Sequence, residues 1–100
     1  NVANARRYSA FAVSQNCIPV TPHLLFPQFM DDDSKDERDL ALFFGIILLG
    51  KCDQLWVFGD MITHGMATEI EKAQHKRIHI RFFNDNCEEV TDVPDTIVKL

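Results

Sequence analysis

The chain has 100 residues, of which 46% are hydrophobic and 25% charged, and these values are typical of one globular domain. The formal net charge of −5 and the scattered basic residues argue against a nucleic-acid polymer as partner, because phosphate binding needs clustered lysine and arginine. The longest apolar run, residues 40–49, is about half the ~20 residues of a membrane span, which argues against a membrane partner.

The N-terminal segment has the pattern of an amphipathic helix. Small or apolar residues recur every three or four positions between residues 1 and 15, and Asn16 is suited to end the helix. Residues 18–21 then predict a short strand, which Pro19 places at a sheet edge because proline has no N–H. Residues 22–33 predict a loop that packs down through its apolar side chains.

A second helix is predicted from Ser34 to Leu49. Ser34 and Glu37 have the spacing of a capping box, and Gly50 is suited to end the helix. The helix is apolar on nearly all sides from residue 40 onward, so we expect it to be buried on more than one face, in a core or a subunit interface. This excess of apolar surface predicts a homo-oligomer, a dimer or larger.

The second half of the chain alternates strands and helices. Residues 54–58 form a continuous apolar run, which is typical of a central parallel strand covered on both faces. A third helix is predicted over residues 63–76, a strand over 78–83 and a turn over 84–86, and the tail contains a last short strand or helix around 96–98. This order predicts one α/β domain over residues 1–100, a three-layer flavodoxin-like or Rossmann-like sandwich with a parallel sheet.

The cysteines suggest the compartment. Cys17, Cys52 and Cys87 are widely spaced and have no pattern typical of a zinc site, so we expect reduced thiols and no metal, although a disulfide between two of them stays open. No signal peptide is recognised before the first helix. We therefore expect a cytoplasmic protein with no cofactor.

The candidate site is the junction between the strand at 54–58 and the third helix. Ligands of open parallel sheets bind beyond the carboxyl ends of the strands. Gly59 and Gly65 allow close approach of the backbone, and Thr63 can cap the helix. Glu69 lies about 65° from the middle of the buried helical stripe, a border position. A carboxylate there could be a nucleophile or an acid/base group, or simply a solvated residue at the helix border.

These residues carry a resemblance to a known family. The segments Leu55–Asp60 and Gly65–Ala73 resemble the strand, loop and helix of nucleoside 2-deoxyribosyltransferase-like proteins. Asn4–Tyr8 and Pro19–His23 resemble segments of small phage and bacterial members of that group. The resemblance covers roughly residues 1–83, and its sharpest element is a small residue followed by the pattern x-x-x-Glu-Ile-x-x-Ala.

The resemblance implies a nucleoside or nucleotide as the small-molecule partner. Glu69 matches the carboxylate that attacks the anomeric carbon of the sugar and displaces the base. Asp60 and Thr63 would hold sugar hydroxyls, and the amides of Gly65 and Met66 could face a phosphate. His23, which follows Pro22 at the predicted strand end, is also placed to touch a ligand. The predicted catalytic residues are Glu69 and Asp60, and the predicted substrate-binding residues are Gly59, Thr63, Gly65, Met66 and His23.

The chain departs from the family at two places. The opening strand and its polar, glycine-containing loop have no counterpart, which indicates an N-terminal truncation. The aspartate that active members carry on the second helix would fall at or near Gly45, and Asp39 lies nearly two turns earlier. The leading interpretation is an N-glycosidic bond enzyme, a transferase or hydrolase. A non-catalytic nucleotide-binding module and an oligomerisation domain remain as alternatives.

Overall fold

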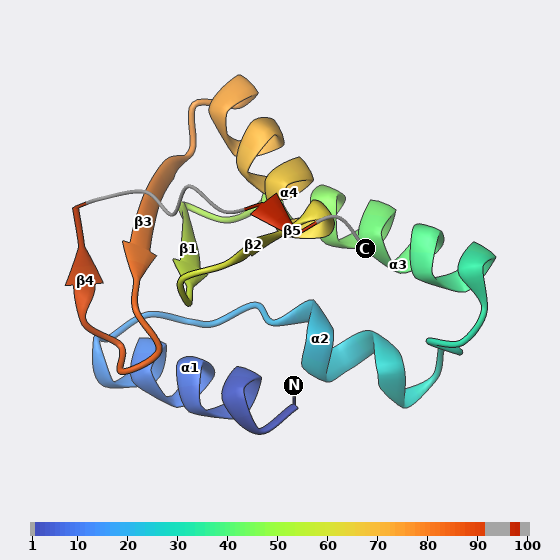
Figure 1. Ribbon diagram of the computed structural model, residues 1–100, viewed down its shortest axis with the longest axis horizontal. Helices are drawn as coiled ribbons and strands as arrows, with labels where there is room; N and C mark the ends of the chain where they lie inside the picture. The colour runs from blue at the N-terminus through green and yellow to red at the C-terminus, as the bar shows by residue number, and fades with distance from the viewer. Residues whose placement is uncertain (1, 92–96, 99–100) are drawn as a thin grey trace. The chain divides into compact units, whose positions relative to one another are not determined.

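The computed structural model describes residues 2–91 and 97–98 (Figure 1). The chain divides into two compact units, Asn1–Leu48 and Leu49–Leu100. The first unit is helical and the second holds two small sheets and a helix, so the protein is a mixed α/β chain. Among the described residues, none of the helices has both the length and the apolar character needed to cross a membrane.

The first unit begins with helix α1, Val2–Ser14, as the periodicity predicts. Asn16 ends it with a φ of 60°, while the N–H of Cys17 donates to the carbonyl of Ala12 at 3.0 Å. The strand predicted over residues 18–21 is wrong, because these residues join no sheet. Ile18 is 94% exposed, and an apolar, β-branched segment that finds no partner strand gains nothing from its strand propensity.

Two short helical turns replace most of the loop predicted over residues 22–33. Helix α2, Pro22–Leu25, has proline at its first position, where the missing N–H costs nothing, and the 3-10 helix η1, Phe26–Gln28, follows directly. The expectation that this segment packs down is confirmed at Phe26, which is 8% exposed and lies 5.6 Å from the ring of Phe44.

Helix α3, Lys35–Leu49, has the predicted cap, since the N–H of Glu37 donates to Ser34 Oγ at 3.3 Å. The Glu37 carboxylate does not reach back to Ser34 but accepts from the N–H of Asp31 at 3.2 Å. Gly45 is buried against Pro22, where an added Cβ would lie 3.7 Å from the proline ring. Within one chain Leu40, Phe43 and Ile47 of α3 are 44%, 57% and 48% exposed, so burial of α3 on more than one face stays a prediction that only a subunit interface could fulfil.

The second unit is built on a strand–helix–strand element. Strands β1, Gln54–Phe58, and β3, His79–Phe83, are parallel neighbours, and helix α4, His64–His75, connects them and packs against both. Strand β4, Glu89–Val90, pairs antiparallel with β3, so the described sheet has the order β1-β3-β4 (Figure 1). Among the described strands β1 therefore lies at an edge of this sheet, not at its centre, and the sheet is not purely parallel, contrary to prediction.

The chain reverses direction between β3 and β4 at a turn that is held by the side chain of Asn84. The Asn84 side-chain oxygen accepts from the N–H groups of Asn86 and Glu88, at 2.9 and 3.0 Å, which brings the chain back along β3. A turn was predicted at residues 84–86, but not the strand after it.

A second, two-stranded sheet consists of β2, Ile62–Thr63, and β5, Ile97–Val98, in parallel. The last strand or helix predicted around residues 96–98 is thus a strand at 97–98, whereas β2 was not predicted. Residue 96 and the tail residues 92–95 and 99–100 lie outside the described residues.

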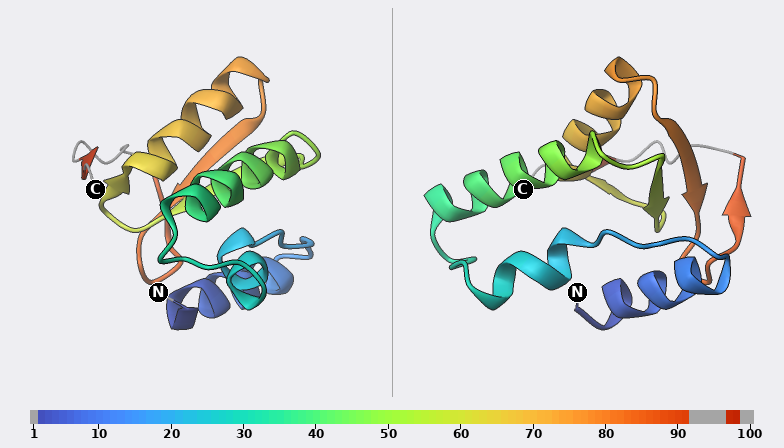
Figure 2. Two further views of the ribbon diagram at one scale, coloured as in Figure 1. Left: turned by 90° about the vertical axis from the view of Figure 1, so that its right-hand side faces the viewer. Right: turned by 180° about the vertical axis from the view of Figure 1, so that it is seen from behind.

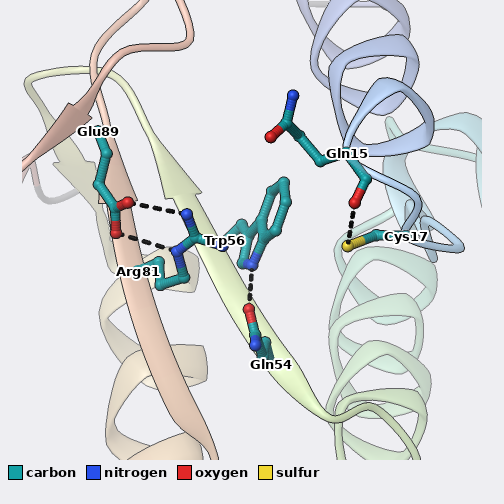
Figure 3. A network of polar contacts seen from close by, with 6 residues as sticks. All are labelled: Gln15, Cys17, Gln54, Trp56, Arg81 and Glu89. Carbon is teal, nitrogen blue, oxygen red and sulfur yellow. Dashed lines mark hydrogen bonds and ion pairs between the residues drawn. The ribbon is translucent and has the colours of Figure 1, made fainter.

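The two faces of the β1–β3 pair are occupied differently. On the face toward α4 (Figure 2), Ala73 of α4 is completely buried and Val57 of β1 is 5% exposed, while Phe83 on the opposite face is 2% exposed. On the strand positions that alternate with Val57, the ring of Phe83 lies 5.0 Å from both Trp56 and Phe58. The guanidinium of Arg81 lies 4.8 Å from the Trp56 ring and makes two hydrogen bonds to the Glu89 carboxylate (Figure 3).

Candidate functional site

The N-terminus of α4 is fixed by a side-chain cap. Thr63 has the extended conformation of a cap residue, with φ −75° and ψ 167°, and its Oγ1 accepts from the N–H of Met66 at 3.2 Å. The predicted capping role of Thr63 is confirmed. The Met66 amide is already engaged by this bond, so a phosphate could take that amide only by displacing the Thr63 hydroxyl. Gly65, the neighbouring amide, is half-buried.

The loops that follow β1 and β3 lie against each other. Gly59 has a φ of +95°, a conformation that side-chain-bearing residues rarely adopt, and its N–H donates to the carbonyl of Phe83 at 2.9 Å. A Cβ at Gly59 would lie 3.3 Å from Oδ1 of Asp85. Asp60, the next residue, is exposed. The carboxyl ends of the two parallel strands therefore bring an aspartate side chain against the glycine predicted to contact a ligand.

Asp85 was missed by sequence reasoning, which assigned it to a turn. The signal that could have found it is the register of the parallel pair. Phe58 lies opposite Phe83, so residues just beyond both strands emerge at the same edge of the sheet.

Glu69 lies on the second turn of α4 and is half-buried, as its border position predicts. Burial raises the pKa of its carboxyl group. No described residue makes an ion pair or hydrogen bond to this carboxylate. Its oxygens must therefore be in contact with solvent, because none of the described side-chain oxygens is both buried and without a hydrogen-bond partner. Glu71 on the same helix is exposed and provides the natural comparison. Glu69 is thus a partly desolvated carboxylate that solvent still reaches.

The predicted site residues do not all fall in one unit. Gly59, Asp60, Thr63, Gly65, Met66 and Glu69 belong to the unit Leu49–Leu100, whereas His23 belongs to the unit Asn1–Leu48. His23 is exposed on α2 and has no strand before it, because residues 18–21 form none. The candidate site is therefore built from β1, α4 and β3 without His23.

Asp39 on α3 does not take the place of the second-helix aspartate that the resemblance implies. Asp39 is exposed and forms an ion pair with Lys35 at 2.8 Å. The hydrogen bond from Lys35 lowers the pKa of Asp39 below its usual value. The carboxylate is thus engaged on the helix surface, and Gly45, at the expected place, carries no side chain.

A separate hollow of about 310 Å³ lies within the first unit. Its polar groups are occupied by one another, since the Ser9 hydroxyl donates to the carbonyl of Ala5 at 2.8 Å and lies 2.7 Å from the Thr21 hydroxyl. None of the sequence-predicted site residues lines it; the lining residues are Ser9, Pro19, Thr21, Leu24, Leu25 and Gln28. Within the described ranges no group of three His, Cys, Asp or Glu side chains could hold a metal ion, and no disulfide joins the three cysteines.

Comparison with known proteins identifies a family for this chain. Searches of curated proteins and of solved structures find nothing similar to the chain. Residues 1–83 match a protein-family model. This span includes β1, α4 and β3 with every sequence-predicted site residue, but not Asp85. The chain belongs to the family described as a domain of unknown function, DUF7768.

Proposed function

We propose that this domain cleaves or transfers the N-glycosidic bond of a nucleoside or nucleotide, with Glu69 as the nucleophile. The observation that carries the proposal is the state of the Glu69 carboxylate, which is half-buried, has a pKa raised by burial and keeps solvent contact. A carboxylate that has lost part of its hydration is more basic, and once ionised it is a better nucleophile. The resemblance of its helix to nucleoside 2-deoxyribosyltransferase-like proteins supports the same role.

The reaction has two balanced steps. A Glu69 oxygen bonds to the anomeric carbon while the carbon–nitrogen bond breaks, and the base leaves with the bonding electrons and takes up a proton. A second base or water then attacks the same carbon, gives up its proton and releases the carboxylate. The covalent intermediate divides one difficult displacement into two easier ones, each passing through an oxocarbenium-like transition state that a nearby carboxylate stabilises.

The residues at the carboxyl ends of the strands would bind the sugar. Asp60 follows β1 directly and would accept hydrogen bonds from sugar hydroxyls, and the Thr63 hydroxyl could donate one while it caps α4. Gly59 lets the backbone approach the ligand, and Gly65 would offer an amide. The proposal includes a three-layer, flavodoxin-like or Rossmann-like arrangement with a parallel sheet, for which the parallel β1–β3 pair is the supporting element.

The test uses the full chain with deoxynucleosides and deoxynucleoside monophosphates, and chromatography measures the released base. We expect release by the parent and by the exposed-residue control Glu71→Gln, and loss of several orders of magnitude in Glu69→Gln. The rate should rise with pH through an inflection above the ordinary glutamate pKa. Acid quenching followed by intact-mass measurement should show a sugar adduct on the parent only.

Two outcomes would overturn this proposal. Equal release of base by Glu69→Gln and the parent would refute the role of Glu69 as nucleophile. Binding of a nucleotide in calorimetry, with no release of base, would favour a non-catalytic nucleotide-binding module.

The second candidate function is that of an oligomerisation domain, which would form a homo-oligomer. The observation that favours it is the exposed apolar face of α3.

A further inference from the structure

The turn after β3 holds Asp85 against Gly59. Asn84 ties this turn together, because its side-chain oxygen accepts two N–H groups and its own N–H donates to the carbonyl of Glu88 at 2.9 Å. The carbonyl of Asn84 also accepts from the N–H of Cys87 at 3.0 Å. Since Gly59 has no side chain, it leaves room for the Asp85 carboxylate, whose Oδ1 would lie 3.3 Å from a Cβ at Gly59. Asp85 is exposed, so its charge acts on whatever approaches this glycine.

The segments that lead away from the candidate edge contain acidic but no basic residues. These segments, residues 59–71 and 84–91, follow β1 and β3 and leave the sheet at the edge to which both strands point (Figure 1). Asp60 is the residue after Gly59, and Asp85 lies against Gly59, so two carboxylates flank one glycine. Glu69 stands on the second turn of the helix that follows. The histidine of these segments, His64, counts as neutral at pH 7.

The lysines and arginines in the described part of this unit stand elsewhere. Those that precede a strand or end α4 are Lys51, Lys72, Lys76 and Arg77. Arg81 is held by two hydrogen bonds to the Glu89 carboxylate. Because parallel strands place their amino ends at one edge, the basic residues gather away from the edge that carries Asp60 and Asp85.

The N-terminus of α4 does not offset the acidic charge. A helix N-terminus attracts an anion through a dipole equivalent to about half an elementary charge and through free N–H groups. Here the N–H of Met66 already donates to the Thr63 hydroxyl at 3.2 Å. Against this half charge stand the full negative charges of Asp60 and Asp85, so a phosphate group that enters this edge meets net repulsion.

We propose that Asp85 is a specificity-determining residue of the candidate site and that, together with Asp60, it excludes phosphorylated substrates in favour of the nucleoside. The hydroxyl groups of an unphosphorylated sugar are donors that carboxylates accept without repulsion. The inference rests on the proposed function in taking a nucleoside as the ligand of this edge, but it does not depend on the covalent step at Glu69. Asp85 lies beyond residues 1–83, which match the family, so the match assigns it no role.

The test compares each common deoxynucleoside with its 5′-monophosphate by equilibrium dialysis against the full chain. At about pH 8 the phosphate carries about two negative charges and histidine is neutral. We expect the parent to bind the nucleoside about tenfold more tightly, and high salt should reduce this ratio. Asp85→Asn should reduce the ratio about fivefold, whereas Asp85→Glu keeps the charge and should retain most of it. Asp53→Asn removes another exposed carboxylate, just before β1, and should leave the ratio at the parental value.

The possible results separate this inference from the enzymatic proposal. A preference for the nucleoside that Asp85→Asn reduces and Asp85→Glu retains supports the inference, and absence of base release would then refute only the covalent step at Glu69. Equal or tighter binding of the monophosphate by the parent, binding of neither ligand, or a ratio that Asp85→Asn leaves unchanged would each overturn the inference. Base release in any of these cases would leave the role of Glu69 standing. Circular dichroism verifies the folding of every variant.

Discussion

Arg77 occupies a backbone position that favours glycine. Two hydrogen bonds close the end of helix α4: the N–H of Ile78 donates to the carbonyl of Ala73 at 2.9 Å, and the N–H of Arg77 donates to the carbonyl of Gln74 at 3.1 Å. This pair of bonds is typical of a helix that ends through a residue in the left-handed conformation. Arg77 is that residue, with a φ of 57°, and it is exposed. We predict that Arg77→Gly stabilises the protein.

The size of the gain follows from two opposing effects. A left-handed conformation costs a residue with a Cβ about 1–2 kcal/mol. Glycine removes that cost but loses more conformational freedom on folding, about 0.5–1 kcal/mol. The net stabilisation should be about 0.5–1 kcal/mol, which corresponds to a rise in melting temperature of roughly 2–8 °C for a domain of this size.

Urea denaturation followed by circular dichroism measures the difference, with Arg77→Ala as the matched control. Alanine lacks the charged side chain but keeps the Cβ, so it should give little of the gain. Asn16→Gly, at the equivalent position of α1, should give less than Arg77→Gly, because asparagine tolerates a left-handed conformation better than arginine. Equal stability of Arg77→Gly and Arg77→Ala would refute the reasoning.

Three further predictions concern the second unit. Burial raises the pKa of Glu69 in the folded state, so the stability that Glu69 contributes should fall as the pH rises from the ordinary glutamate pKa to the raised one. Glu69→Gln should therefore be more stable than the parent at neutral pH. Urea midpoints of the two proteins at acid and neutral pH measure the difference. Gly59→Ala should destabilise by about 1–2 kcal/mol, since alanine must adopt a φ of +95° and meet Asp85, and an unchanged urea midpoint would contradict this. Arg81→Met should return the lowered pKa of Glu89 toward its usual value, which an NMR titration of the carboxyl carbon detects.

The helices α1, α3 and α4 and the positions of strands β1 and β3 were predictable because their signals are local. Periodicity located α1 and α4, and Ser34 and Thr63 marked helix starts that the structure confirms. The strand over residues 18–21 failed because strand formation depends on a partner that local sequence does not reveal. The apolar run of β1 predicts a central strand, whereas Trp56 and Phe58 pack on Phe83 of the single neighbouring strand in the described sheet.

The candidate site was predictable only in part, for the same reason. The border position of Glu69 follows from helical geometry, and the structure places it half-buried. The approach of Asp85 to Gly59 depends on the register of two strands about 25 residues apart, a long-range pairing that periodicity does not contain. The hairpin to β4 likewise depends on the side-chain bonds of Asn84.

The distribution of chromophores follows from the division into two units. The chain has one tryptophan and one tyrosine. Trp56 lies on β1 against Arg81 and Phe83, whereas Tyr8 lies on α1 beneath the guanidinium of Arg7 at 4.8 Å. Emission excited at the red edge of the absorption spectrum therefore comes from Trp56, which belongs to the sheet unit, while Tyr8 belongs to the helical unit. Unfolding around Trp56 can thus be followed without introducing any dye.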